Sequence, residues 1–185
     1  MAHRVCPWWI GYLLASPIRR WIQDPLPIVT PYLHEGMTVL EPGPGMGFFT
    51  IPLAQLVGPS GRVIAVDLQP RMINGLKQRA ARASVLDRIG GRVAAAETMG
   101  IGDLAGKVDF TLAFAVVHEF PDASHFFREA SIASRPKAKM LLAEPSGHVD
   151  QKKFDEELEV ASEAGFMLVE RPAIRRSRAA VLVKK

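Results

Sequence analysis

The first feature that suggests chemistry is a glycine-rich stretch that follows an acidic residue. In VLEPGPGMGFFT (residues 39–50), Gly43, Gly45 and Gly47 occupy alternate positions after Glu41. Glycines that follow a strand allow a ligand to approach main-chain N–H groups closely. A dinucleotide-binding turn has the form GxGxxG and requires its third glycine at the position of Phe48. The observed GxGxG spacing therefore disfavours NAD and indicates another ligand.

A second acidic residue supports a ribose-containing ligand. Asp67 closes the apolar run VIAVD, where its carboxylate can accept hydrogen bonds from both hydroxyls of a ribose that lies across the glycine loop. A plain tight turn between a strand and a helix remains the alternative for the glycines alone. Together, Asp67 and the glycine loop favour a ligand that contains a ribose.

Two histidines are candidates for acid–base chemistry. His118 follows a predicted strand, and His148 follows the next one in AEPSGHV. Either side chain can serve as the base for a hydroxyl or amine acceptor, or can only hydrogen-bond to a loop. His118 and Glu119 resemble the start of the zinc-binding motif HExxH. The second histidine of that motif would fall four residues after His118, where this sequence has Asp122. Since Cys6 is the single cysteine, thiolate zinc clusters are also excluded, and we expect no metal.

Short β-branched runs alternate with helical patterns from residue 37 onward. This order predicts an α/β fold with a doubly wound, Rossmann-like sheet of seven strands, mostly parallel. The last two strands are joined by the short basic connection 171–178, so we expect them to pair as an antiparallel hairpin. The predicted strands are 37–41, 62–67, 89–95, 108–117, 139–143, 166–170 and 179–183, and the predicted helices are 48–57, 70–84, 123–134 and 150–164.

Residues 1–36 have a different character from the domain predicted over residues 37–185. The segment is rich in aromatic residues and prolines, and Pro17 interrupts its helical pattern. We expect a helical lid over the active site, with a structural brace or a membrane-surface helix as alternatives. The residues expected to contact the substrate from this lid are His3, Cys6, Trp8 and Trp9.

These motifs resemble a known family, the class I S-adenosylmethionine-dependent methyltransferases, in its small-molecule branch. VLEPGPGMGFFT looks like the family's first motif, and VIAVDLQP looks like the second. VDFTLAFAVVHEFPD resembles the fourth strand with its loop, and SRPKAKMLLAEP resembles the turn into the fifth strand. The resemblance runs from about Met37 to the C-terminus.

The resemblance implies roles for individual residues in holding S-adenosyl-L-methionine. Glu41 would lie near the ammonium group, Asp67 would bind the ribose, and Leu68 would pack on the adenine. Main-chain groups of Phe114 and Ala115 would complete the cofactor site.

Two stretches depart from the family pattern. An Asp that accepts from the adenine amino group often follows the third strand, but Ala94, Ala95 and Ala96 occupy that stretch, and Glu97 is the candidate replacement. A PGG turn usually precedes the fifth strand, and here it is Pro136, Lys137 and Ala138. This turn requires a different backbone conformation.

The sequence therefore predicts an enzyme that transfers a methyl group from S-adenosylmethionine to a small molecule by in-line displacement. A nucleic-acid methyltransferase that uses the basic connection is one alternative, although the NPPY-type signature is absent. A non-catalytic cofactor-binding or membrane-surface module is another. The net charge of +4 is a weak signal for nucleic acid, and no apolar run approaches the ~20 residues of a membrane span. A single cysteine suits the cytoplasm and disfavours arsenite as acceptor, and the oligomeric state stays open.

Overall fold

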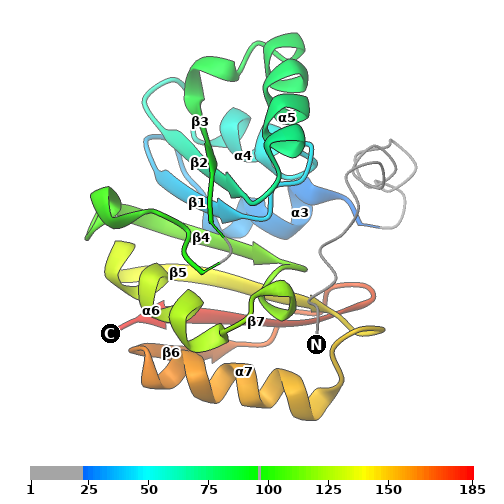
Figure 1. Cartoon of the computed structure of the whole chain (residues 1–185), viewed down its shortest axis with the longest axis vertical. Helices are drawn as coiled ribbons and strands as arrows, with labels where there is room; N and C mark the ends of the chain where they lie inside the picture. Colours follow the sequence, from blue (N-terminus) through cyan, green and yellow to red (C-terminus); the bar gives the residue numbers. More distant parts are fainter. Residues whose placement is uncertain (1–22, 96) are drawn as a thin grey trace. The chain divides into compact units, whose positions relative to one another are not determined.

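The computed structural model describes residues 23–95 and 97–185. The chain divides into two compact units, which Figure 1 colours from blue to green and from green to red. The N-terminal unit comprises the described residues 23–94, and the C-terminal unit comprises residues 95 and 97–185. The predicted lid contacts His3, Cys6, Trp8 and Trp9 lie outside the described residues, as does Ala96.

Three parallel strands form the sheet of the N-terminal unit, in the order β3-β2-β1. The helices α4 and α5 contact each other and both contact β2, so they cover one face of these strands. Pro70 stands at the start of α5, where its missing N–H removes no helical hydrogen bond. The elements are α3 (Pro25–Val29), η1 (Thr30–Tyr32), β1 (Thr38–Pro42), α4 (Thr50–Leu56), β2 (Arg62–Asp67), α5 (Pro70–Arg82), η2 (Leu86–Arg88) and β3 (Ile89–Val93).

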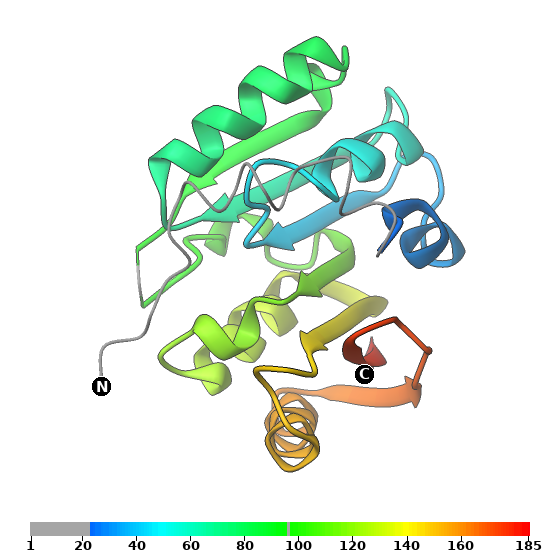
Figure 2. The ribbon, with the colours of Figure 1, turned by 90° about the vertical axis from the view of Figure 1, so that its right-hand side faces the viewer.

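Four strands form the sheet of the C-terminal unit, in the order β4-β5-β7-β6. β4 and β5 are parallel, whereas β7 runs antiparallel to both β5 and β6. Figures 1 and 2 show α7 alongside β6, and α7 also packs against α6. The elements are η3 (Gly102–Leu104), β4 (Val108–Phe114), η4 (Val117–Glu119), α6 (Ala123–Ala133), β5 (Ser134–Pro145), α7 (Gln151–Glu163), β6 (Phe166–Glu170) and β7 (Ser177–Lys184).

The two long helices of the C-terminal unit begin at side-chain caps. Asp122 accepts a hydrogen bond from the N–H of Ser124, and Asp150 accepts one from the N–H of Lys153. Each such cap satisfies a donor that the first helical turn leaves unpaired and contributes about 1 kcal/mol. Behind the caps, the apolar faces meet in the core, where the ring centroids of Phe127 and Phe166 lie 6.5 Å apart. No helix among the described residues is long and apolar enough to cross a membrane.

The predicted fold class is confirmed, with seven strands that are parallel except for the pairings of β7. The predicted end of the fourth strand at Val117 was wrong. β4 ends at Phe114, because Ala115 adopts φ +56° and the chain then turns into η4. Because β4 ends at Phe114, His118 does not directly follow the strand.

The fifth strand is longer than predicted and contains the unusual turn within it. The β4–β5 register shifts between the pairs Val108–Ser134 and Phe110–Lys139, which marks an irregularity around Pro136 to Ala138. Lys137 adopts φ +66° there, a left-handed conformation that costs a residue with a Cβ about 1–2 kcal/mol. The Lys at this position therefore adopts the conformation that a glycine adopts freely.

Replacing Lys137 with Gly is expected to stabilise the protein by about 1 kcal/mol, because glycine removes the left-handed strain. Urea denaturation followed by circular dichroism measures the change. The control is Lys152→Gly in α7, where the same replacement is expected to cost about 1 kcal/mol. If Lys137→Gly is also destabilising, the strain at this position is wrongly assigned.

Candidate functional site

The three glycines of the loop after β1 all adopt left-handed backbone conformations, with φ between +53° and +87°. A Cβ on Gly47 would lie 2.5 Å from Cδ1 of Leu76 in α5, so any larger residue at this position would force the buried Leu76 side chain to move. A Cβ on Gly45 would meet nothing within 4 Å. Gly47 therefore has a structural role, whereas Gly45 borders open space next to an accessible main chain.

Asp67 accepts hydrogen bonds from backbone N–H groups of its own turn and of the glycine loop. Its Oδ1 accepts from the N–H of Gln69 at 2.8 Å. Burial raises the pKa of Asp67 to about 6, and the backbone N–H groups of Gln69 and Gly45 limit that rise. The Asp67 carboxyl group at the end of β2 thus contacts the glycine loop, and the ligand is predicted to contact the same loop.

Glu41 lies close to the end of β1 and is only 4% exposed. Burial raises its pKa to about 8; the Thr50 hydroxyl opposes the rise and the charge of Asp67 adds to it. Oε2 of Glu41 has no hydrogen-bond partner among the described residues. A cation or a donor placed beside Glu41 would therefore satisfy an otherwise unpaired buried acceptor.

A buried carboxylate and a histidine form the centre of the C-terminal unit's candidate site. Glu144, near the end of β5, is fully buried, and its Oε1 accepts from the N–H groups of Val116 and Val117 at 3.2 and 2.8 Å. Its Oε2 pairs with Nδ1 of His118. Since β4 and β5 are parallel neighbours, both side chains lie at the carboxyl ends of their strands. With Nδ1 facing the carboxylate, Nε2 is the ring atom that can accept a proton.

The environment of His118 favours its protonated form. Burial by itself lowers the pKa of His118, but the hydrogen bond and charge of Glu144, together with the charge of Glu119, raise it above the usual value. This effect makes His118 a stronger base than an unpaired histidine.

The other predicted catalytic histidine lies next to the first. The ring centroids of His118 and His148 are 5.7 Å apart in an edge-on arrangement, and His148 is exposed in the turn after β5. Arg178 holds this turn through Nη1, which donates to the carbonyls of Ser146 and Val149 at 3.2 and 2.7 Å. The structure thus brings together the two histidines that the sequence singled out.

Glu157 of α7 adds a second buried carboxyl group to this cluster. Glu157 is 5% exposed. Burial is the main cause that raises the pKa of Glu157 to about 7; the charge of Glu144 adds to the rise, and Lys153 and His118 oppose it. Oε2 of Glu157 has no hydrogen-bond partner within the described part of the chain. No group of three or more His, Cys, Asp or Glu side chains among residues 23–95 and 97–185 is placed to hold a metal ion.

The remaining predicted site residues are distributed over both units. Leu68 is half-buried after β2, and Glu97 is exposed. Phe114 is buried at the end of β4, and the N–H of Ala115 donates to the carbonyl of Ala143 at 2.7 Å. A non-glycine residue in the left-handed region, such as Ala115, is frequent at functional sites.

Sequence reasoning missed Glu144 and Glu157. A signal for Glu144 is present in MLLAEP, where a charged residue ends an apolar strand. Glu157 has no such signal, because it lies within the polar helix sequence QKKFDEELEVASE.

The comparisons with known proteins agree with this geometry. A family model described as "Methyltransferase domain" matches residues 33–172, so the chain belongs to this methyltransferase family. The predicted membership of the class I S-adenosylmethionine-dependent methyltransferases is thereby confirmed, and with it the enzyme class and the cofactor. The crystal structure of a SAM-dependent methyltransferase from Aquifex aeolicus has the same fold, with a TM-score of 0.82 and 22% identity over 97% of this chain and 98% of that one.

Curated relatives match shorter parts of the chain. An arsenite methyltransferase of Halobacterium salinarum is 28% identical over 109 residues, which are 59% of this chain and 27% of that protein. A protein-L-isoaspartate O-methyltransferase of Methanothrix thermoacetophila is 43% identical over 51 residues, which are 28% of this chain and 24% of that protein. The match spans about a quarter of the length of each relative.

Replacing Glu144 with Gln is expected to lower the pKa of His118, because the variant loses the charged hydrogen bond and the negative charge that raise this pKa against the effect of burial. The measurement is an NMR pH titration of the His118 ring, which requires neither cofactor nor acceptor. In the wild type, the midpoint is expected above the ordinary pKa of a histidine side chain. Asp122→Asn, at the exposed cap of α6, serves as the control. An unchanged His118 midpoint in Glu144→Gln would contradict the assigned contact.

Proposed function

We propose that this methyltransferase acts on a small-molecule acceptor. Its nucleophile is an oxygen or a nitrogen atom that carries a proton. The observation that supports this proposal is the His118 ring held by a fully buried Glu144. Soft nucleophiles such as sulfur or arsenic need no base, whereas a hydroxyl or a protonated amine must lose a proton as it attacks. A buried carboxylate that orients the base is useful only in the second case.

S-adenosylmethionine supplies an electrophilic methyl group on a sulfonium, which leaves as a neutral thioether. Nε2 of His118 takes the proton of the acceptor, and Glu144 stabilises the imidazolium that forms. Glu144 is a positioning residue in this scheme, while His118 is the proposed catalytic base. His148 lies beside His118 and is the second candidate to contact the acceptor.

The residues of the N-terminal unit fit the cofactor. The sulfonium and ammonium groups are cations, and Glu41 offers an unpaired buried carboxyl oxygen. The open space beside Gly45 leaves room for a ligand against the main chain, and Asp67 offers a carboxylate to the ribose hydroxyls. We assign Gly43, Gly45, Asp67 and Glu41 to binding the cofactor, with Leu68 against the adenine.

Other assigned residues remain part of this proposal. Glu97 would accept from the adenine amino group in place of the missing Asp, and the main chain at Phe114 and Ala115 would complete the cofactor site. The lid residues His3, Cys6, Trp8 and Trp9 lie outside the described residues, and we retain them as candidates for closing the site over the acceptor.

The basic connection between β6 and β7 gives limited support to a nucleic-acid substrate. Arg171 pairs with Asp155 at 3.2 Å, and Arg178 donates to two carbonyls of the turn that carries His148. Two of the arginines that could contact phosphates are thus engaged within the unit. This arrangement favours the small-molecule proposal.

Replacing Asp67 with Ala is expected to weaken the binding of S-adenosylhomocysteine by about 1.5–3 kcal/mol, because the ribose hydroxyls lose charged hydrogen bonds. Isothermal titration calorimetry measures the affinity. Asp87→Ala, an exposed Asp in η2, is the matched control and is expected to bind like the wild type. Equal affinity in Asp67→Ala and the wild type would remove Asp67 from the cofactor site.

Methyl-labelled S-adenosylmethionine incubated with the enzyme and a cell extract is expected to transfer label to the low-mass fraction. His118→Asn should reduce this transfer by about 10²–10⁴-fold while the affinity for S-adenosylhomocysteine stays unchanged. Size separation, followed by nuclease and protease digestion, locates the label. Label in RNA or protein would refute the small-molecule acceptor, and full activity of His118→Asn would refute the base.

A further inference from the structure

Strand β6 has the properties of an interaction surface. It is the last strand in the order β4-β5-β7-β6, so one of its edges has no neighbouring strand among residues 23–95 and 97–185. Three consecutive apolar side chains on it, Met167, Leu168 and Val169, are 50%, 41% and 50% exposed. Edge strands usually carry charges or proline at such positions to prevent pairing with another chain. These three residues, which we call the β6 patch, contain neither.

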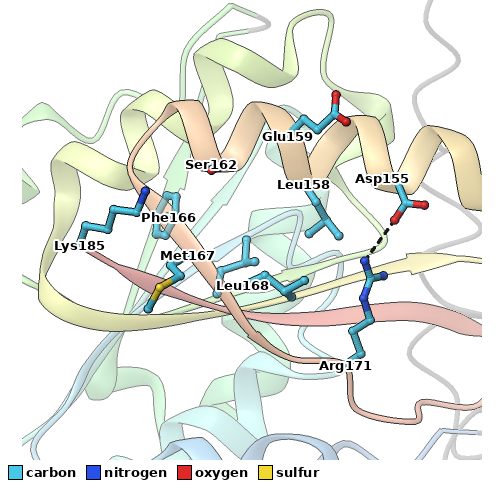
Figure 3. A pocket seen from close by; sticks show the side chains of 10 residues that line it. Asp155, Leu158, Glu159, Ser162, Phe166, Met167, Leu168, Arg171 and Lys185 are labelled. Carbon is cyan, nitrogen blue, oxygen red and sulfur yellow. Dashed lines mark hydrogen bonds and ion pairs between the residues drawn. The ribbon is translucent and has the colours of Figure 1, made fainter.

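A groove extends the apolar surface from β6 to helix α7. It has a volume of about 360 Å³, and Figure 3 shows Leu158 of α7 and Leu168 of β6 on its walls. The Arg171–Asp155 ion pair stands at one end, and Lys185 stands at the other. An apolar side chain from outside could therefore be buried beside the β6 patch.

The charges around β6 are arranged so that the surface complements itself. Lys184 pairs with Phe166 at the start of β6, and the N–H of Lys185 donates to the carbonyl of Gly165 at 3.0 Å. The main chain of both lysines thus lies beside the beginning of β6 on the β7 side, from which their long side chains must reach past β6 to a docked strand, whereas Glu170 is exposed at the end of β6. An antiparallel copy of β6 would bring the Glu170 of each chain to the lysines of the other.

We propose that β6 is the interface of a homodimer, in which a second copy of this chain docks antiparallel along the free edge. The two-fold axis passes near Leu168, so the β6 patch of one copy covers that of the other in an isologous contact. The register of β6 against β7 shifts between Leu168 and Glu170, which interrupts the regular ladder at Val169. Main-chain pairing is therefore short, and burial of the patch with the two charge contacts stabilises the dimer.

Sedimentation velocity over a range of protein concentrations tests the proposal. The wild type is expected to sediment at twice the monomer mass, and the double variant Met167→Lys/Val169→Lys at the monomer mass. Leu86→Lys in η2 replaces an apolar side chain of similar exposure, 40%, in the N-terminal unit and should remain dimeric. Unchanged circular dichroism and S-adenosylhomocysteine affinity show that the variants are folded. A monomeric wild type, a dimeric double variant or a monomeric Leu86→Lys would each overturn the proposal.

Charge reversal tests the orientation of the second copy. Glu170→Lys places like charges at both ends of the interface and is expected to weaken the dimer by at least tenfold. Adding Lys184→Glu and Lys185→Glu to the same chain restores opposite charges and should return the dimerisation constant toward the wild-type value. If the triple variant dimerises no better than Glu170→Lys, the antiparallel arrangement is wrong. If the partner of β6 is a strand from a different protein, the purified chain is expected to be a monomer, which contradicts the homodimer.

Discussion

The burial of carboxyl groups at the ends of parallel strands is the constraint on which both candidate sites depend. Glu41 precedes Pro42 at the end of β1, and Glu144 precedes Pro145 at the end of β5. A buried carboxylate is costly unless hydrogen bonds or an opposite charge stabilise it. Glu144 receives two main-chain N–H groups and the ring of His118, whereas Oε2 of Glu41 has no partner among the described residues. Glu144 is therefore satisfied by groups of the protein, whereas one oxygen of Glu41 is not.

This difference has a consequence for how stability depends on pH. The pKa values of Glu41, Asp67 and Glu157 are raised to about 8, 6 and 7, so between their ordinary values and these values the folded chain binds more protons than the unfolded chain. The free energy of unfolding then falls as the pH rises through this window. A cation bound beside Glu41 would favour the ionised form of this carboxyl group. Glu41 would then no longer contribute to the fall in the free energy of unfolding.

The local motifs could be read from the sequence because a few adjacent residues determine them. The glycine loop and Asp67 belong to one strand–helix–strand unit, β1–α4–β2, and the backbone N–H of Gly45 donates to the Asp67 carboxyl group. Glu144 could not be assigned, because its role depends on the register that sets Phe114 of β4 opposite Ala143 of β5. The end of β4 was misjudged because Val116 and Val117 continue the β-branched pattern, while the left-handed turn at Ala115 has no residue signature.

Helix α7 separates the acid–base cluster from the surface along β6, because its 3.6-residue period assigns successive residues to different faces. Phe154, Glu157 and Ala161 lie on the buried face, which brings Glu157 near Glu144 and His118. Asp155, Leu158 and Glu159 line the groove beside β6. Since Phe154 and Ala161 are almost completely buried, a partner in the groove would meet a helix that is already fixed by its core face. Docking along β6 can therefore occur without displacing the carboxyl group that supports the histidine, and the two surfaces can serve separate functions.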